Sequence, residues 1–194
     1  MTTGTSETAY AGIRDRLRAE TATLHDRTET VFASFDLARA DHYRRYLAAQ
    51  SAVFAPLEQA LDDRFGSMLA DWPRRRRAAA LAADLEDLDA APPPPVIDTA
   101  GWSEAEAWGA LYVMEGSRLG GVLLGRQIAA DQPGAPIRFL SQAAPGRFWA
   151  EFLRCLEARA PLLEWTGIRA GAMATFRLFH DAALLWQPRP ADAE

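Results

Sequence analysis

Stretches rich in Ala, Leu, Glu and Arg alternate along the chain with clusters of Gly and Pro. This alternation is typical of an all-helical protein rather than of short strands. In the first stretch, apolar residues recur near the 3.6-residue period of an amphipathic helix, at Ile13, Leu17, Leu24, Val31 and Phe32. The pattern therefore predicts a long first helix over about 9–32.

The same pattern predicts further helices over about 39–65, 74–89, 103–128, 147–159 and 166–186. Asp41 and Gly66 are candidate caps of the second helix. The proline run 92–95 must be extended, because each ring fixes φ and removes a donor, so it separates two helices. Ser103 followed by Glu106 has the form of a capping box and opens the fourth helix.

The length of 194 residues fits one domain, and no repeat or boundary divides the sequence. The apolar share of 49% and the charged share of 24% are those of an ordinary globular protein. We expect an all-α, single-domain helical bundle over 1–194, in which about 1–8 and 187–194 are flexible tails.

Charge and composition narrow the possible partners. The formal net charge of −5 gives no reason to expect nucleic acid or an anionic membrane as a partner. There is no apolar run of about 18 residues and no apolar signal core at the polar N-terminus, so a cytoplasmic location is expected. All 21 basic residues are Arg, which excludes lysine chemistry. Cys155 is the one cysteine and cannot form an internal disulfide or a cysteine metal cluster.

Four consecutive arginines, 74–77, have the composition of a nucleic-acid patch. Acidic residues follow closely, at Asp84, Glu86, Asp87 and Asp89. Mixed charge of this kind is more typical of a solvated helix face, which is the interpretation we favour.

His25 is the most distinctive of the three histidines. Glu29 lies one helical turn later on the same face, where a carboxylate can accept a hydrogen bond from the imidazole and leave its other nitrogen for a metal. Arg18 lies two turns earlier on that face, at about 10 Å by helix rise. A surface ion-pair ladder of Arg18, Arg27 and Glu29 fits the spacing equally well. His42 is expected at the surface, and His180 is a weaker candidate ligand.

Gly116, Gly120, Gly121 and Gly125 lie inside the predicted fourth helix. Each glycine lowers helix stability by about 1 kcal/mol relative to alanine, so a compensating role is needed. A phosphate-binding loop is excluded, because such a loop requires a lysine. The spacing leaves two neighbouring stripes without side chains, which suits either a flat ligand or close helix packing. A bend or unwinding at Gly120 and Gly121 would favour the ligand.

Two segments together resemble the heme oxygenase family: LRAETATLHDRTE at 17–29 and ALYVMEGSRLGG at 110–121. The likeness is greatest to the bacterial enzymes that supply biliverdin to bacteriophytochromes. It covers the first and fourth helices specifically, and the rest of the chain by length and helical pattern. The resemblance implies an all-helical heme oxygenase-like fold that holds heme between these two helices.

The resemblance also implies roles for individual residues. His25 would be the axial iron ligand, and Glu29 its hydrogen-bonding partner. Arg18 would bind a heme propionate, since it can fork onto a carboxylate. The further heme-binding candidates are Tyr112 in the second motif and Arg154 on the fifth helix, where Arg147 is also available and no motif chooses between the two arginines. The distal wall and catalytic site would consist of Gly116, Ser117, Gly120 and Gly121.

Ser117 stands where mammalian-type members of the family carry an aspartate that organises water near bound oxygen. The serine is similar to the phytochrome-linked branch. Ordered water held by Ser117 or by backbone groups is the proton route that this residue suggests.

The activity implied is cleavage of heme b, with O2 and electrons, to biliverdin, CO and ferrous iron at the α-meso carbon. The chain has no dinucleotide fingerprint and no cluster-forming cysteines, so a ferredoxin or a reductase must supply the electrons. A bacteriophytochrome is the implied acceptor of biliverdin. Two alternatives remain: a non-catalytic heme carrier, which needs His25 but not the distal glycines, and a helical scaffold that binds another small molecule or none.

Overall fold

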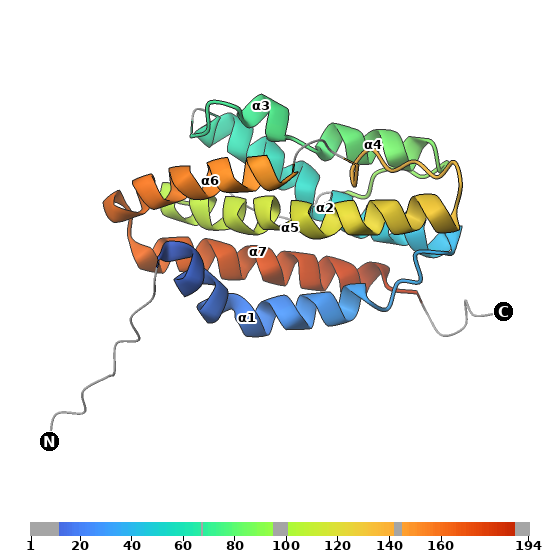
Figure 1. The fold of residues 1–194 in the computed structure, drawn as a ribbon, viewed down its shortest axis with the longest axis horizontal. Coiled ribbons are helices and arrows are strands. Elements are labelled where there is room, and N and C mark those ends of the chain that lie inside the picture. Colours follow the sequence, from blue (N-terminus) through green and yellow to red (C-terminus); the bar gives the residue numbers. More distant parts are fainter. Residues whose placement is uncertain (1–11, 67, 95–100, 142–144, 189–194) are drawn as a thin grey trace, which may run out of the picture.

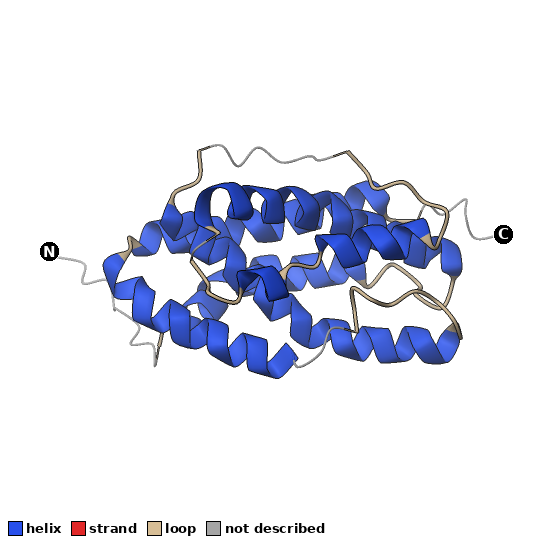
Figure 2. Cartoon of the chain, turned by 90° about the horizontal axis from the view of Figure 1, so that it is seen from above, coloured by secondary structure: helices blue, strands red, loops and turns tan. Residues whose placement is uncertain are grey.

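The computed structural model describes residues 12–66, 68–94, 101–141 and 145–188. Within these ranges the regular structure is helical, as Figure 2 shows. The elements in chain order are α1 (Ile13–Phe32), α2 (Ala40–Phe65), α3 (Trp72–Arg75), α4 (Ala78–Glu86), α5 (Glu104–Asp131), α6 (Pro145–Arg159), the 3-10 turn η1 (Ala160–Leu162) and α7 (Trp165–Trp186). The predicted all-helical class is confirmed. Residues 1–8 and most of 187–194 lie outside the described residues.

The helix boundaries agree closely with the predicted ones at α1, α2, α5, α6 and α7. The capping box of α5 is confirmed, because the Glu106 amide donates to Ser103 Oγ (3.3 Å) and the Ser103 amide donates to Glu106 Oε2 (2.8 Å). The Asp41 cap is wrong: the N-cap position is Arg39, whose guanidinium pairs with Asp41 (3.2 Å). Gly66 does occupy the C-cap position of α2.

The single helix predicted over 74–89 is wrong, and the solvated face predicted for its four arginines holds only for Arg74 and Arg76. The chain is extended at Arg76, with ψ of 140°, so α3 ends there and α4 starts at Ala78. Arg75 and Arg77, on either side of this break, are buried, while Arg74 and Arg76 are exposed. Arg75 pairs locally with Asp71, but its other partner, Glu115, lies on another helix and could not be found from the local pattern.

The helices pack around α7, which contacts α1, α2 and α5 along its length. Figure 1 shows α1 beside α7 at one side of the molecule, with α5 and α6 on the other side of α7. Helices α1 and α5 thus share a neighbour but scarcely touch each other. None of the helices in the described ranges has both the length and the apolar composition that a membrane crossing needs.

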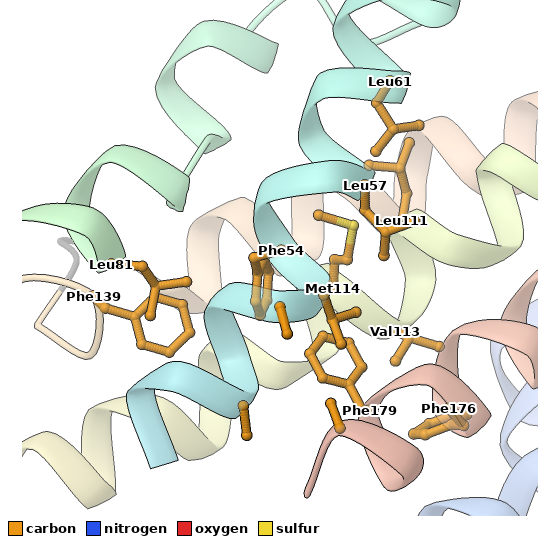
Figure 3. Packing of buried hydrophobic residues seen from close by; sticks show 14 of the residues in the cluster. Phe54, Leu57, Leu61, Leu81, Leu111, Val113, Met114, Phe139, Phe176 and Phe179 are labelled. Carbon is orange, nitrogen blue, oxygen red and sulfur yellow. The ribbon is translucent and has the colours of Figure 1, made fainter. Parts of the chain in front are cut away.

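Buried apolar side chains from α2, α4, α5 and α7 form the core (Figure 3). The ring of Phe54 on α2 is central to it and lies 5.3 Å from each of the Phe139 and Phe179 rings, measured between centroids. Leu81 of α4 and Met114 of α5 join the same cluster. This core fixes the face of α5 that is turned toward α2.

Glycines bring the first halves of α5 and α7 into backbone contact. A Cβ on Gly109 would lie 2.0 Å from the Ile168 carbonyl oxygen, and a Cβ on Gly171 would lie 2.0 Å from the Glu106 carbonyl oxygen. Backbone atoms cannot rotate away as a side chain can, so only glycine fits at either position. This close crossing sets the distance between the two helices.

We expect Gly171→Ala to lower the free energy of unfolding by about 3 kcal/mol, the upper range for overpacking, because two helix backbones must separate. Urea denaturation measures the change. Gly101→Ala is the matched control, since no atom lies within 4 Å of a Cβ at that position. Equal stability of the two variants would contradict the close crossing.

Candidate functional site

A cavity of about 550 Å³ opens between α1 and α5, above α7. Its size is within the usual range for a small-molecule or cofactor site, about 300–1,000 Å³. The cavity brings together residues from both sequence motifs: Arg18, His25, Glu29, Tyr112, Gly116, Ser117, Gly120 and Gly121. Eight of the nine predicted site residues therefore line one space, although the motifs are far apart in sequence.

His25 lies on the α1 wall with half of its side chain exposed. Its Nδ1 is 3.6 Å from Glu29 Oε2 and 3.7 Å from Asp26 Oδ1. These distances are longer than a direct hydrogen bond and suit a bridging water. The ring also packs edge-on against Phe176 of α7, with centroids 5.6 Å apart. Both carboxylates lie on the Nδ1 side, so Nε2 is the nitrogen that can coordinate a metal.

Ligand atoms of His25, Asp26 and Glu29 lie within 4.8 Å of one another and could together hold an ion. All three residues are exposed at the cavity rim. A histidine with carboxylates beside one ring nitrogen is also the usual arrangement of an imidazole that binds a metal through its other nitrogen. Asp26 is a second such carboxylate that the i, i+4 spacing did not reveal.

The glycines of α5 have two different roles. A Cβ on Gly120 would have no atom within 4 Å, and one on Gly116 would meet only the Trp149 ring at 3.7 Å. A Cβ on Gly125 would instead lie 3.1 Å from Leu140 Cβ. Gly116 and Gly120 thus leave open space in the cavity, whereas Gly125 lets the turn at Leu140 pack closely on α5. The helix is not unwound at Gly120 and Gly121, because α5 continues through both residues.

The hydroxyl of Ser117 is fixed by two hydrogen bonds on the cavity wall. It donates to the Met114 carbonyl oxygen (2.8 Å) and accepts from Arg77 Nη2 (3.0 Å). Arg77 Nη2 also donates to the Met114 carbonyl. Burial and, to a smaller extent, the charge of Arg118 lower the pKa of Arg77 to about 9, although Glu115 and Glu58 act in the opposite direction. Ser117 therefore has its proton engaged and can offer an acceptor lone pair to the cavity.

One end of the cavity is positively charged. Arg14 and Arg18 of α1 lie there with Tyr112 of α5. Burial raises the pKa of Tyr112, and the charges of both arginines oppose this rise. Arg154 is not among the lining residues: it is exposed on α6, with Nη2 3.9 Å from Cys155 Sγ. Arg147 pairs with Glu151 (2.9 Å). The role predicted for Arg154 stays a prediction.

Several lining residues were missed by the sequence analysis. Arg14 could have been found, because it precedes Arg18 by one helical turn. Others come from α2, α6 and α7, where no local pattern distinguishes them from core residues: Tyr46, Gln50, Trp149, Phe176 and Phe179. Their contribution is mainly an apolar and aromatic lining.

This chain is similar to known proteins both in sequence and in fold. The model of the family described as heme oxygenase matches residues 11–183. A heme oxygenase of Xanthomonas campestris pv. campestris (strain 8004) is 36% identical in an alignment of 164 residues that covers 78% of this chain and 93% of that relative.

Solved structures share the fold. Heme oxygenase from Neisseria meningitidis, in crystal structures of its NO- and CO-bound forms, superposes with a TM-score of 0.79 at 24% identity, covering 95% of this chain and 96% of that one. Heme oxygenase from Leptospira interrogans superposes with a TM-score of 0.66 at 19% identity, covering 88% and 97%. The family match spans both walls of the cavity, and the chain therefore belongs to the heme oxygenase family of oxidoreductases.

Proposed function

We propose that this protein binds heme b between α1 and α5 and uses O2 and electrons to open the macrocycle to biliverdin, CO and ferrous iron. One observation carries the proposal: His25 on one helix and the bare backbone at Gly116 and Gly120 on another face the same cavity. A carrier would need the histidine alone. Membership of the heme oxygenase family supports the same activity.

The residues present fit heme. The rings of Trp149, Phe176 and Phe179 give the apolar surface that a porphyrin needs. His25 can supply an axial nitrogen, and the two arginines at the charged end can fork onto propionates. The open space at Gly120 is a cradle that any side chain would fill.

Heme, when bound, supplies the redox-active iron and is itself the molecule that is opened. His25 would hold it through a neutral imidazole, which lacks the strong electron push of a thiolate. Glu29 and Asp26 would keep the proton on Nδ1 and so fix the tautomer. The wall at Gly116 and Gly120 leaves room over the ring, where a larger side chain would exclude O2.

Ser117 would hold water rather than act as a proton donor itself. Its proton is engaged by the Met114 carbonyl, and Arg77 occupies one of its acceptor positions. A cavity water that donates to the remaining lone pair would keep its other proton directed into the cavity. The aspartate of mammalian-type members can be replaced in this way without a new charge.

The finer features come from the resemblance. We propose cleavage at the α-meso carbon, a ferredoxin or reductase as electron donor, a bacteriophytochrome as acceptor of biliverdin, and a cytoplasmic location.

Arg14 and Arg18 should govern heme affinity rather than turnover. We expect the double variant Arg14→Gln/Arg18→Gln to weaken heme binding roughly tenfold, because two charge-assisted contacts with propionates are lost from an exposed site. Added salt should reduce the difference. Titration of apoprotein with hemin measures it. Arg27→Gln is the control, since Arg27 is exposed on the same helix outside the cavity lining. Equal heme affinity of the double variant and Arg27→Gln would show that Arg14 and Arg18 do not bind the propionates.

The function itself is tested by adding hemin to purified protein and recording the Soret band, then adding reductant in air with catalase present. We expect a shifted Soret band that decays as the broad red absorption of biliverdin rises. A stable reduced complex would indicate a carrier, and no Soret shift would exclude heme binding.

A further inference from the structure

A buried charge cluster lies directly behind the distal wall. Glu115 is 1% exposed and immediately precedes Gly116 and Ser117. Both of its carboxylate oxygens accept hydrogen bonds: Oε2 from Arg75 Nη1 (2.7 Å) and Arg118 Nε (2.9 Å), and Oε1 from Arg118 Nη2 (2.8 Å). Glu115 is thus the buried anion that joins two buried arginines.

The cluster connects three helices. Arg75 of α3 donates to Asp71 Oδ1 (2.7 Å) and to the Phe148 carbonyl oxygen on α6 (3.0 Å). Arg118 of α5 donates to the Arg75 carbonyl oxygen. The Phe148 ring lies 5.0 Å from the Arg75 guanidinium carbon and 5.3 Å from that of Arg118. In Figure 1, α3 and α6 lie on one side of α5 and α1 lies on the other.

The pKa of Arg75 agrees with strong ion pairing in this cluster. Burial acts to lower the pKa of Arg75, but the hydrogen bond that Arg75 donates to Asp71 and the charges of Glu115 and Asp71 outweigh it, so the pKa is raised. Removal of one partner from a buried ion pair leaves an uncompensated charge and is strongly unfavourable. Without Glu115, Arg75 and Arg118 would face each other across a dry interior.

The two faces of α5 around Glu115 make different contacts. Glu115 and Arg118 point away from the cavity, while Gly116, Ser117 and Gly120 line it. The glycines have no side chains with which to pack against the cavity side. Glu115 and Arg118 therefore support the wall from the side opposite the cavity.

We propose that Glu115, through its bonds to Arg75 and Arg118, is a positioning residue that fixes the distance of the Gly116–Gly120 wall from the bound substrate. The proposal rests on the proposed heme oxygenation, because the wall matters only if chemistry takes place beside it. Displacement of a catalytic wall by about 1 Å can lower a rate by roughly 100-fold.

Glu115→Gln tests the proposal, since it keeps the shape of the side chain and removes the charge. In the heme-free protein, we expect amide hydrogen exchange across 116–121 to be roughly tenfold faster or more, because the segment loses its fixed support. In the loaded protein, we expect turnover to fall by roughly 10–100-fold with heme affinity little changed. The ferric visible spectrum and the ratio of biliverdin isomers should also change, which a general loss of stability would not produce.

Glu151→Gln is the matched control. Glu151 Oε2 lies 3.8 Å from Arg75 Nη2, so this variant removes a carboxylate near the same arginine without touching α5. Its exchange, spectrum and isomer ratio should equal those of the wild type. If Glu115→Gln has the same exchange, spectrum and isomer ratio as Glu151→Gln, the proposal is overturned.

Glu115→Asp keeps the charge and shortens the side chain. It tests the positioning role of residue 115 if Glu115→Gln does not fold. Folded Glu115→Asp with wild-type exchange and turnover would overturn the proposal, whereas faster exchange at 116–121 with altered isomers would support it. A wild-type protein that binds heme but does not degrade it would refute the proposed function alone, because the exchange measurement on heme-free protein still tests the role of Glu115.

Discussion

His25→Ala should abolish heme turnover while leaving the fold intact. His25 is half exposed and contacts other residues mainly through carboxylates at Nδ1 and the edge of Phe176, so its loss should change stability little. The iron would lose its axial nitrogen. We expect turnover to fall by more than about 100-fold, beyond the 10–100-fold effect typical of a residue that only supports a metal ligand.

The absorption spectrum and the rate of biliverdin formation measure this effect. Imidazole added to the solution should restore the histidine-type Soret band, because the truncated side chain leaves room for it. His180→Ala is the control, since His180 lies outside the cavity lining and pairs with Asp181 (3.1 Å). If turnover were lost in His180→Ala and kept in His25→Ala, the ligand would be misassigned.

Substitution of Gly120 should change stability and activity in opposite directions. A Cβ at this position meets no atom within 4 Å, so Gly120→Ala should stabilise the heme-free protein by up to about 1 kcal/mol through helix propensity. Gly120→Leu fills the space above the substrate. We expect it to lower turnover by roughly 100-fold or to change the biliverdin isomer, with a smaller effect on heme affinity.

Thermal unfolding of the apoprotein and product analysis of the loaded protein measure the two effects. Ala129→Leu is a control for adding a leucine on α5, because Ala129 is exposed outside the cavity lining. Wild-type turnover and isomer ratio in Gly120→Leu would show that the open space has no catalytic role.

The sequence was most informative where the pattern is local. The period of apolar residues predicted five helices to within a few residues, and the capping box at Ser103 and Glu106 was predicted correctly. The helix break at Arg76 was missed, because its partners lie on other helices: Glu58 accepts from the Arg77 amide, and Glu115 accepts from the buried guanidinium of Arg75. Four adjacent arginines carry no local sign that alternate members are buried.

Part of the functional site could also be predicted, because its two motifs are local in the sequence. Two motifs carried His25 and the glycines of α5, and the structure places both on one cavity. Spacing alone could not separate the role of Gly120, which faces open space, from that of Gly125, which packs on Leu140. Arg154 was chosen without a motif, whereas the arginine that does line the cavity beside Arg18 is Arg14.

The central claim is that this cavity opens heme rather than merely holding it. The most direct test is to supply the wild-type protein with limiting hemin, reductant and air, with catalase present, and to measure biliverdin, released ferrous iron and CO together. We predict that all three appear in equal amounts as heme disappears, and that Gly120→Leu and His25→Ala each suppress them. Loss of heme without CO, or a stable reduced complex that releases no iron, would contradict the account.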